Sequence, residues 1–202
     1  MILFTGGEDV HPSFYGHTSP KDFCHSNVMR DESESMLFNI ATENNILKAG
    51  ICRGLQFINV MSNGTLMHHI TGHSGSYHKI RLINGEEFIS NSLHHQMVVP
   101  PEDAIVVGWS HKRLSKLYVG DKDKKNDYSG QEVEIVIYPR TKAFGVQYHP
   151  EMFAPSTKAY KYFNLMIRKA LEMPWENFIK KFTNGKEKDA KVYTGEHGCT
   201  DR

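Results

Sequence analysis

Cysteine is scarce in this sequence, and so are long apolar runs and any excess of charge of one sign. The 202 residues include three cysteines, Cys24, Cys52 and Cys199, an odd and sparse set that argues against a disulfide framework and is typical of a reducing compartment. A formal net charge of +1 excludes a global attraction to nucleic acid or to an anionic membrane. No stretch approaches the roughly 20 apolar residues of a membrane span, and the N-terminus does not resemble a signal peptide. We expect a soluble cytoplasmic protein with neither a nucleic-acid nor a membrane partner.

The composition that remains is that of an ordinary globular protein. Hydrophobic residues make up 39% and charged residues 23%, enough to build a core. The length predicts a single domain, which we place at residues 1–183, followed by a polar C-terminal tail at 184–202. The twelve histidines raise the question of a metal, which needs three ligands at suitable spacing. They form no ligand motif, so we assign no metal; those considered are His68, His69, His73, His78, His94 and His95.

The first third of the chain alternates between predicted strands and helices. Residues 1–5 read as a short buried strand that stops at Gly6-Gly7, and residues 46–51 as a second strand. A helix is predicted from residue 31 to 44, and a second one continues after Cys52 until Asn63-Gly64. The face of the first helix expected in the core holds Met36, Leu37, Ile40 and Ala41. This alternation predicts a parallel sheet with helical crossovers.

The remainder predicts hairpins and then helices. Residues 78–108 contain short apolar runs broken by turn residues, and residues 132–138 and 143–148 read as a strand pair. The charged stretch from 112 to 131 is interpreted as a solvated hairpin tip rather than an anion site. An amphipathic helix is predicted at 156–172, and a short terminal helix docks through Trp175, Phe178, Ile179 and Phe182.

Cys52 lies where the second strand turns into a helix. Small neighbours, Gly50 and Gly54, leave room for the sharp turn that presents a nucleophile in the elbow of hydrolases. The helix N-terminus favours the thiolate, and its backbone N–H groups suit a developing oxyanion. A buried structural cysteine on a parallel strand explains this segment equally well.

A histidine and an acid follow a later strand. A cysteine nucleophile needs a base, and the base needs an orienting group, roles that His149 and Glu151 would fill. Because the carboxyl ends of parallel strands share one edge of a sheet, Gly6-Gly7, Cys52 and His149 are all expected there. The paired motifs favour catalysis over a structural cysteine and a surface histidine.

Several segments together resemble the class I glutamine amidotransferase-like superfamily. The likeness is greatest to its branch of γ-glutamyl hydrolases and γ-glutamyl-γ-aminobutyrate hydrolases. The matching segments follow the family's order over about residues 1–170. They are Leu3 to Tyr15, Arg30-Asp31 with Glu34, Gly50 to Gln56, Asn63 to Leu66, Asn91 to Gln96, and Gln147 to Glu151.

The resemblance implies roles for individual residues. Cys52, His149 and Glu151 would form the catalytic triad, and backbone N–H groups of Gly7 and Arg53 the oxyanion hole. The residues implied in substrate binding are Gly6, Gln56, Asn91, Ser92, His94, His95 and Gln96.

The resemblance also implies a fold, and the chain differs from the family pattern at its N-terminus. The expected fold is α/β, a three-layer, mostly parallel sheet flanked by helices and flavodoxin-like, with an added antiparallel strand portion. Family members usually carry a further strand–helix–strand–helix portion before Thr5, so the chain is expected to be shortened at the N-terminus. The sheet edge thereby exposed favours a homodimer, or a synthetase or ligase partner.

Three functions remain open at the level of sequence. The first is hydrolysis of a γ-glutamyl amide, glutamine or a γ-glutamyl amine, through a thioester on Cys52 and without a cofactor. The second is a glutaminase subunit that passes ammonia to a separate synthetase or ligase. The third is a non-catalytic binding module on the same fold.

Overall fold

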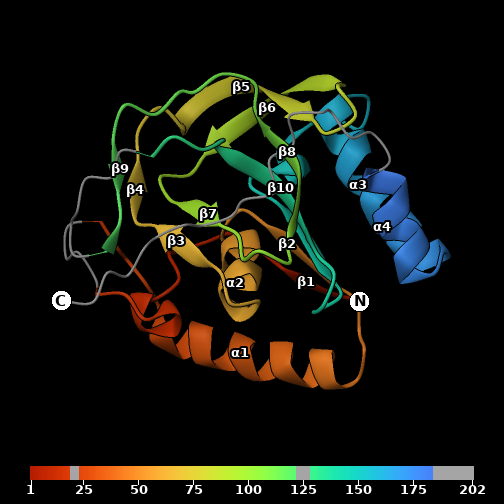
Figure 1. The fold of residues 1–202 in the computed structure, drawn as a ribbon, viewed down its shortest axis with the longest axis horizontal. Coiled ribbons are helices and arrows are strands. Elements are labelled where there is room, and N and C mark those ends of the chain that lie inside the picture. The colour runs from red at the N-terminus through yellow and green to blue at the C-terminus, as the bar shows by residue number, and fades with distance from the viewer. Residues whose placement is uncertain (19–22, 122–127, 184–202) are drawn as a thin grey trace.

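A curled, mixed sheet forms the centre of the protein. The computed structural model describes residues 1–18, 23–121 and 128–183. Its seven-stranded sheet has the order β1-β2-β11-β10-β8-β5-β6 (Figure 1). These strands are β1 (Ile2–Phe4), β2 (Lys48–Ile51), β5 (Ser74–Leu82), β6 (Glu87–Leu93), β8 (Ile105–Ser110), β10 (Val133–Tyr138) and β11 (Ala143–Val146). Two small ladders pair β3 (Thr65–Met67) with β7 (Met97–Val99), and β4 (His69–Ile70) with β9 (Tyr118–Val119).

Helices cover both faces of the sheet. One core contains the inward side chains of α1 (Val28–Glu43) and α2 (Arg53–Met61). A second core on the opposite face contains those of α3 (Lys158–Glu172) and α4 (Trp175–Thr183), visible in blue in Figure 1. Short 3₁₀ turns occur at Pro12–Tyr15 (η1) and Pro150–Met152 (η3). The predicted helices and hairpins are thus confirmed, and no helix among the described residues has the length and apolar character to cross a membrane.

The prediction of a mostly parallel sheet is wrong. Parallel pairing joins β1 to β2 and β2 to β11, whereas the ladder from β11 through β10, β8 and β5 to β6 is antiparallel. Parallel neighbours require a crossover of about a dozen residues or more. The turns at Asn84-Gly85 and at residues 139–142 are too short for a crossover, so these strands double back. The fold is therefore α/β with a mixed sheet.

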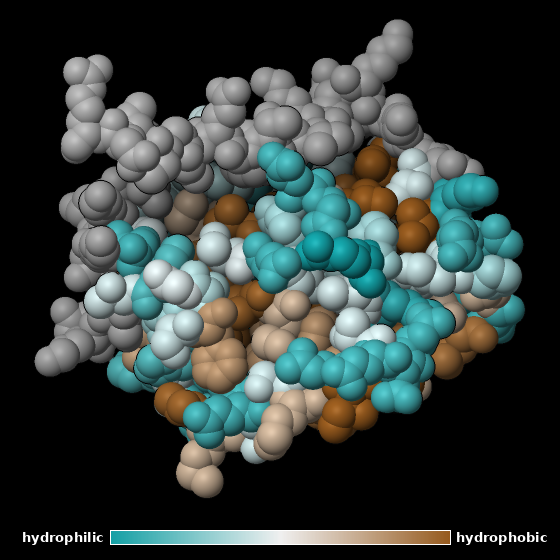
Figure 2. Space-filling view, turned by 60° about the horizontal axis from the view of Figure 1, so that its bottom comes forward, coloured by the Kyte–Doolittle hydropathy of each residue, from teal (hydrophilic) through white to brown (hydrophobic). Residues whose placement is uncertain are grey.

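The face that α1 buries also differs from the prediction. Ala41 is fully buried, as expected, but Met36, Leu37 and Ile40 are 63%, 43% and 54% exposed. Figure 2 shows the side of the molecule that bears α1, where brown and tan patches lie between hydrophilic side chains. The helix turns Asp31 inward instead, where its carboxylate pairs with Arg53. A buried arginine needs its counter-ions more than three apolar side chains need burial, and this decides the orientation of the helix. The expected dimer or partner stays a prediction.

Two further predictions lie outside the described residues. They are the polar tail at 184–202, which includes Cys199, and residues 122–127 of the charged stretch.

Candidate active site

Cys52 occupies a strained turn between β2 and α2. Its φ of 52° and ψ of −111° lie where residues with a side chain are uncommon. The Cys52 N–H donates to the Val146 carbonyl at 2.8 Å, which ties the turn to the neighbouring strand β11. A Cβ at Gly54 would lie 2.0 Å from the Phe4 carbonyl oxygen, and one at Gly50 would lie 2.5 Å from the Gly54 backbone. The predicted elbow and its need for both glycines are therefore confirmed.

Buried ion pairs fix the residue that follows the nucleophile. The Arg53 guanidinium donates to Asp31 and Glu34 of α1, and it is 1% exposed. Arg30 donates to the other oxygen of Glu34 at 3.0 Å and to the Gly6 carbonyl at 3.2 Å. Removing one member of such a buried pair costs about 3–5 kcal/mol because a charge is left uncompensated. This network holds the Gly6-Gly7 loop beside the elbow.

Gly6 lies close to the side chains of both Cys52 and His149. A Cβ built on Gly6 would lie 2.9 Å from His149 Cε1 and 3.8 Å from Cys52 Cβ. Any larger residue here would collide with the imidazole. The ends of the three parallel strands thus bring together the loop, the cysteine and the histidine, as their order in the sequence predicts.

His149 is held by both its ring and its backbone. Its Nδ1 lies 2.7 Å from Glu151 Oε1, and a carboxylate only accepts, so Nδ1 carries the proton and Nε2 is left as the free base. The Asn91 side chain accepts from the His149 N–H at 2.9 Å and donates to its carbonyl at 3.2 Å. Glu151 therefore sets the tautomer, and Asn91 clamps the main chain.

The sulfur lies in a site that keeps it protonated. Burial raises the pKa of Cys52 to about 12. The Arg53 backbone N–H opposes this rise, the Glu151 and Glu134 carboxylates add to it, and the Gln147 side chain opposes it. The helix N-terminus does favour the thiolate through the Arg53 N–H, as expected, but the loss of water around the buried thiol has the larger effect.

A cavity of about 200 Å³ opens on Cys52. Its wall includes predicted site residues from the first loop, from α2 and from the segment after β6. They are Gly7, Gln56, His94, His95 and Gln96. Further wall residues not predicted to bind are Glu8, Asp9, His25 and Leu93. The cavity is small, and its lining mixes polar side chains such as Asp9, Gln56 and His95 with apolar surface, which fits a small ligand with polar groups.

Ser92 was predicted to bind substrate but does not line the cavity, and the buried residue Gln147 was not predicted to belong to the site. Ser92 is 0% exposed and its hydroxyl lies 3.2 Å from His73 Nδ1, away from the cavity wall. Gln147 is also fully buried, and its side-chain carbonyl accepts from Gln56 Nε2 at 3.2 Å. The position of Gln147, two residues before His149, is the feature of the sequence that could have identified it. His25 carried no signal in the sequence.

Part of the chain also matches a known protein family. Residues 1–83 match the model of the Peptidase C26 family. That match includes the Gly6-Gly7 loop and Cys52, and it ends before His149. The chain is thus similar to class I glutamine amidotransferase-like proteins of the peptidase C26 branch.

Individual relatives agree with this assignment. A "Putative glutamine amidotransferase-like protein" of Rickettsia prowazekii is 43% identical over 80 residues, 40% of this chain and 28% of that protein. A "Putative glutamine amidotransferase" of Mycobacterium tuberculosis is 29% identical over 168 residues, 79% of this chain and 53% of that protein. The chain thus spans well under two thirds of the length of either relative.

A solved structure shares the fold of this glutamine amidotransferase-like chain. PurLQS from Thermotoga maritima superposes with a TM-score of 0.54 over 83% of this chain and 80% of that one, at 18% identity. An identity this low supports a shared fold and nothing more specific.

Proposed function

We propose that this protein hydrolyses γ-glutamyl amides, glutamine or a γ-glutamyl amine, through a γ-glutamyl thioester on Cys52. One observation carries the proposal. A cysteine in a strained elbow opens on a cavity, and a histidine oriented by a carboxylate approaches the same glycine, Gly6, as the cysteine does. Nucleophile, base and orienting group are the parts that an acyl-transfer site requires.

The first half-reaction forms the thioester. As Cys52 Sγ attacks the γ-carbonyl carbon, its proton passes to His149 Nε2, so no resting thiolate is needed. The backbone N–H of Arg53 points at the sulfur, and Gly7 borders the same cavity, so both suit the oxyanion that develops on the carbonyl oxygen. The carbon–nitrogen bond then breaks, and the His149 proton leaves with the amine or ammonia.

The second half-reaction releases glutamate. Water attacks the thioester carbon while His149 takes one of its protons, and the carbon–sulfur bond breaks. The proton returns from His149 to the sulfur, which restores the starting state. Glu151 stabilises the imidazolium that forms twice in the cycle.

Mass spectrometry of glutamate release tests the proposal. The full chain is incubated with glutamine and with a panel of γ-glutamyl amines, and Cys52→Ala serves as the inactive control. Release of glutamate by the wild type alone supports the hydrolase. Release that appears only when a synthetase or ligase is added identifies a glutaminase subunit. Absence of turnover in both settings, with no acylation of Cys52, leaves a binding module.

A further inference from the structure

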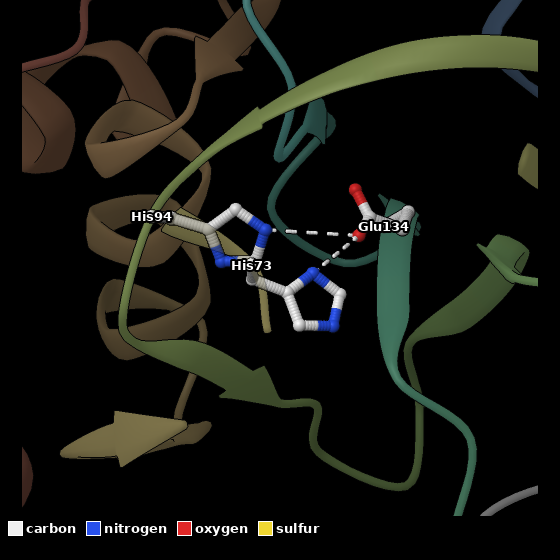
Figure 3. A group of neighbouring side chains, drawn as sticks. All are labelled: His73, His94 and Glu134. Carbon is white, nitrogen blue, oxygen red and sulfur yellow. Dashed lines mark ion pairs between the residues drawn. The ribbon is translucent and has the colours of Figure 1, made fainter. Parts of the chain in front are cut away.

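A second cluster of polar side chains is buried behind the cavity, within the antiparallel half of the sheet. It consists of His73, just before β5, His94, just after β6, and Glu134 on β10 (Figure 3). All three are buried, and one potential ligand atom from each lies within 4.8 Å of the other two. None of them has a part in the proposed triad.

The tautomer of His73 is set by a neighbouring acid. Its Nε2 lies 2.9 Å from Glu132 Oε2. Glu132 also accepts from the Tyr118 hydroxyl and from the Ser115 N–H, so its buried carboxylate is well supplied with donors. An ionised carboxylate only accepts, so His73 Nε2 carries the proton. His73 Nδ1 is thus left with a lone pair, and it lies 3.2 Å from the Ser92 hydroxyl and 3.5 Å from Glu134 Oε1.

His94 presents a second lone pair to the same oxygen. Its Nδ1 lies 2.8 Å from the Gln96 carbonyl, which also only accepts, so the proton is on Nδ1. Its Nε2 has no hydrogen-bond partner among the described residues and lies 3.7 Å from Glu134 Oε1. Two lone pairs and a carboxylate thus face one another.

Glu134 is a buried acid whose carboxylate is surrounded by imidazole rings. It is 0% exposed, and neither carboxylate oxygen has a hydrogen-bond partner among the residues that the structure describes. His78 Nε2 lies 3.0 Å from Glu134 Oε1. The unpartnered Nε2 of His94 faces the same buried carboxylate, and a cation between these groups would satisfy both.

We propose that His73 Nδ1, His94 Nε2 and Glu134 bind a divalent transition-metal ion, zinc in the first place, with His78 within reach as a fourth ligand. Two histidines and a glutamate are a ligand set typical of zinc. Ligand atoms around tetrahedral zinc are roughly 3.4 Å apart, given bonds of about 2.0–2.1 Å. The separations of 3.5 and 3.7 Å from Glu134 Oε1 are close to this value.

Two supporting contacts are those that metal-bound histidines usually make. A ligating imidazole donates its other N–H to a carboxylate or to a backbone carbonyl. His73 does so to Glu132, and His94 does so to Gln96. His94 also lines the cavity, so a bound ion would anchor the cavity wall formed by residues 93–96 without entering the cysteine chemistry.

Metal titration of the chelator-treated full chain, freed of any affinity tag, tests the site. Calorimetry with Zn²⁺ and visible absorption with Co²⁺ are expected to show one ion per chain. The Co²⁺ spectrum should carry the intense bands of a four- or five-coordinate nitrogen and oxygen site, without a thiolate charge-transfer band. His94→Ala and Glu134→Gln should weaken binding by roughly 100-fold or more.

A surface pair of the same chemistry supplies the control. His111 Nδ1 lies 2.6 Å from Glu87 Oε1 at the protein surface, so His111→Ala and Glu87→Gln should leave the affinity unchanged. If either cluster variant fails to fold, the Co²⁺ spectrum of the wild type still shows whether a nitrogen and oxygen site binds the ion. Absence of binding, a thiolate spectrum, or full affinity in both cluster variants would overturn the proposal.

Discussion

The two halves of the sheet hold polar groups in opposite ways. At the carboxyl ends of β1, β2 and β11 the functional groups stand on loops and turns, and Cys52 opens on a cavity. In the antiparallel half, Glu132 and Glu134 lie in or beside β10, buried among histidines. Side chains at strand ends can therefore reach a ligand, whereas polar groups inside a sheet need each other or a bound ion as partners.

Replacing the nucleophile is expected to have the largest effect. Cys52→Ala removes the only sulfur placed in the elbow, so glutamate release should fall at least roughly 10³-fold. Cys24, which is half-buried near the Val10 carbonyl, is the matched control, and Cys24→Ala should keep full activity. Both rates are measured by mass spectrometry. An equal loss of glutamate release in the two variants would contradict the assignment of Cys52 as the nucleophile.

The backbone of the elbow comes next. In Gly54→Ala the new methyl group meets the Phe4 carbonyl oxygen at 2.0 Å, so β1 and α2 must separate. We expect a loss of about 3 kcal/mol in the free energy of unfolding, measured with denaturant. Gly16→Asn is the control, because Gly16 has a φ of 71° and open space around it, and asparagine tolerates this conformation. Similar losses in both variants would show that close approach is not what the elbow requires.

Asn91 joins the two halves, because it lies on β6 and clamps the His149 backbone. Asn91→Ala should lower kcat about 10- to 100-fold and leave KM nearly unchanged, since it misplaces the base without touching the substrate. Steady-state kinetics measure this split. Asn91→Ser, which keeps a polar group, should recover part of kcat. A rise in KM with kcat intact would make Asn91 a binding residue instead.

The smallest effect concerns the protonation of the sulfur. The pKa of Cys52 is raised from 9.0 to about 12, so the thiolate fraction of the folded protein should still be rising about tenfold per pH unit beyond pH 9. Alkylation of Cys52 by iodoacetamide, followed by peptide mapping, reports this rise. In the denatured chain the rate should level off near the ordinary pKa. A plateau at neutral pH in the folded protein would mean a resting thiolate.

The elbow could be predicted because its information is local. A strand, a cysteine between glycines and a helix occupy residues 46–62, and steric exclusion at Gly54 acts on a neighbour already expected in the sheet. His149 and Glu151 are likewise two residues apart. Short segments of this kind carry both the residue types and their geometry.

The rest depended on pairing between distant segments. The inward turn of α1 follows from Asp31 meeting Arg53, a contact that an apolar periodicity does not contain. The His73, His94 and Glu134 cluster comes from three elements brought together by antiparallel pairing, and the hairpins predicted from the sequence did not specify which of them lie side by side. Spacing along the chain therefore gave no ligand motif.

Covalent capture of the nucleophile tests the central claim most directly. The full chain is incubated with a diazoketone analogue of glutamine, and intact mass is followed by peptide mapping. The account predicts one adduct per chain, located on Cys52, and its suppression by excess glutamine. No adduct, or an adduct on Cys24 that glutamine does not suppress, would contradict it.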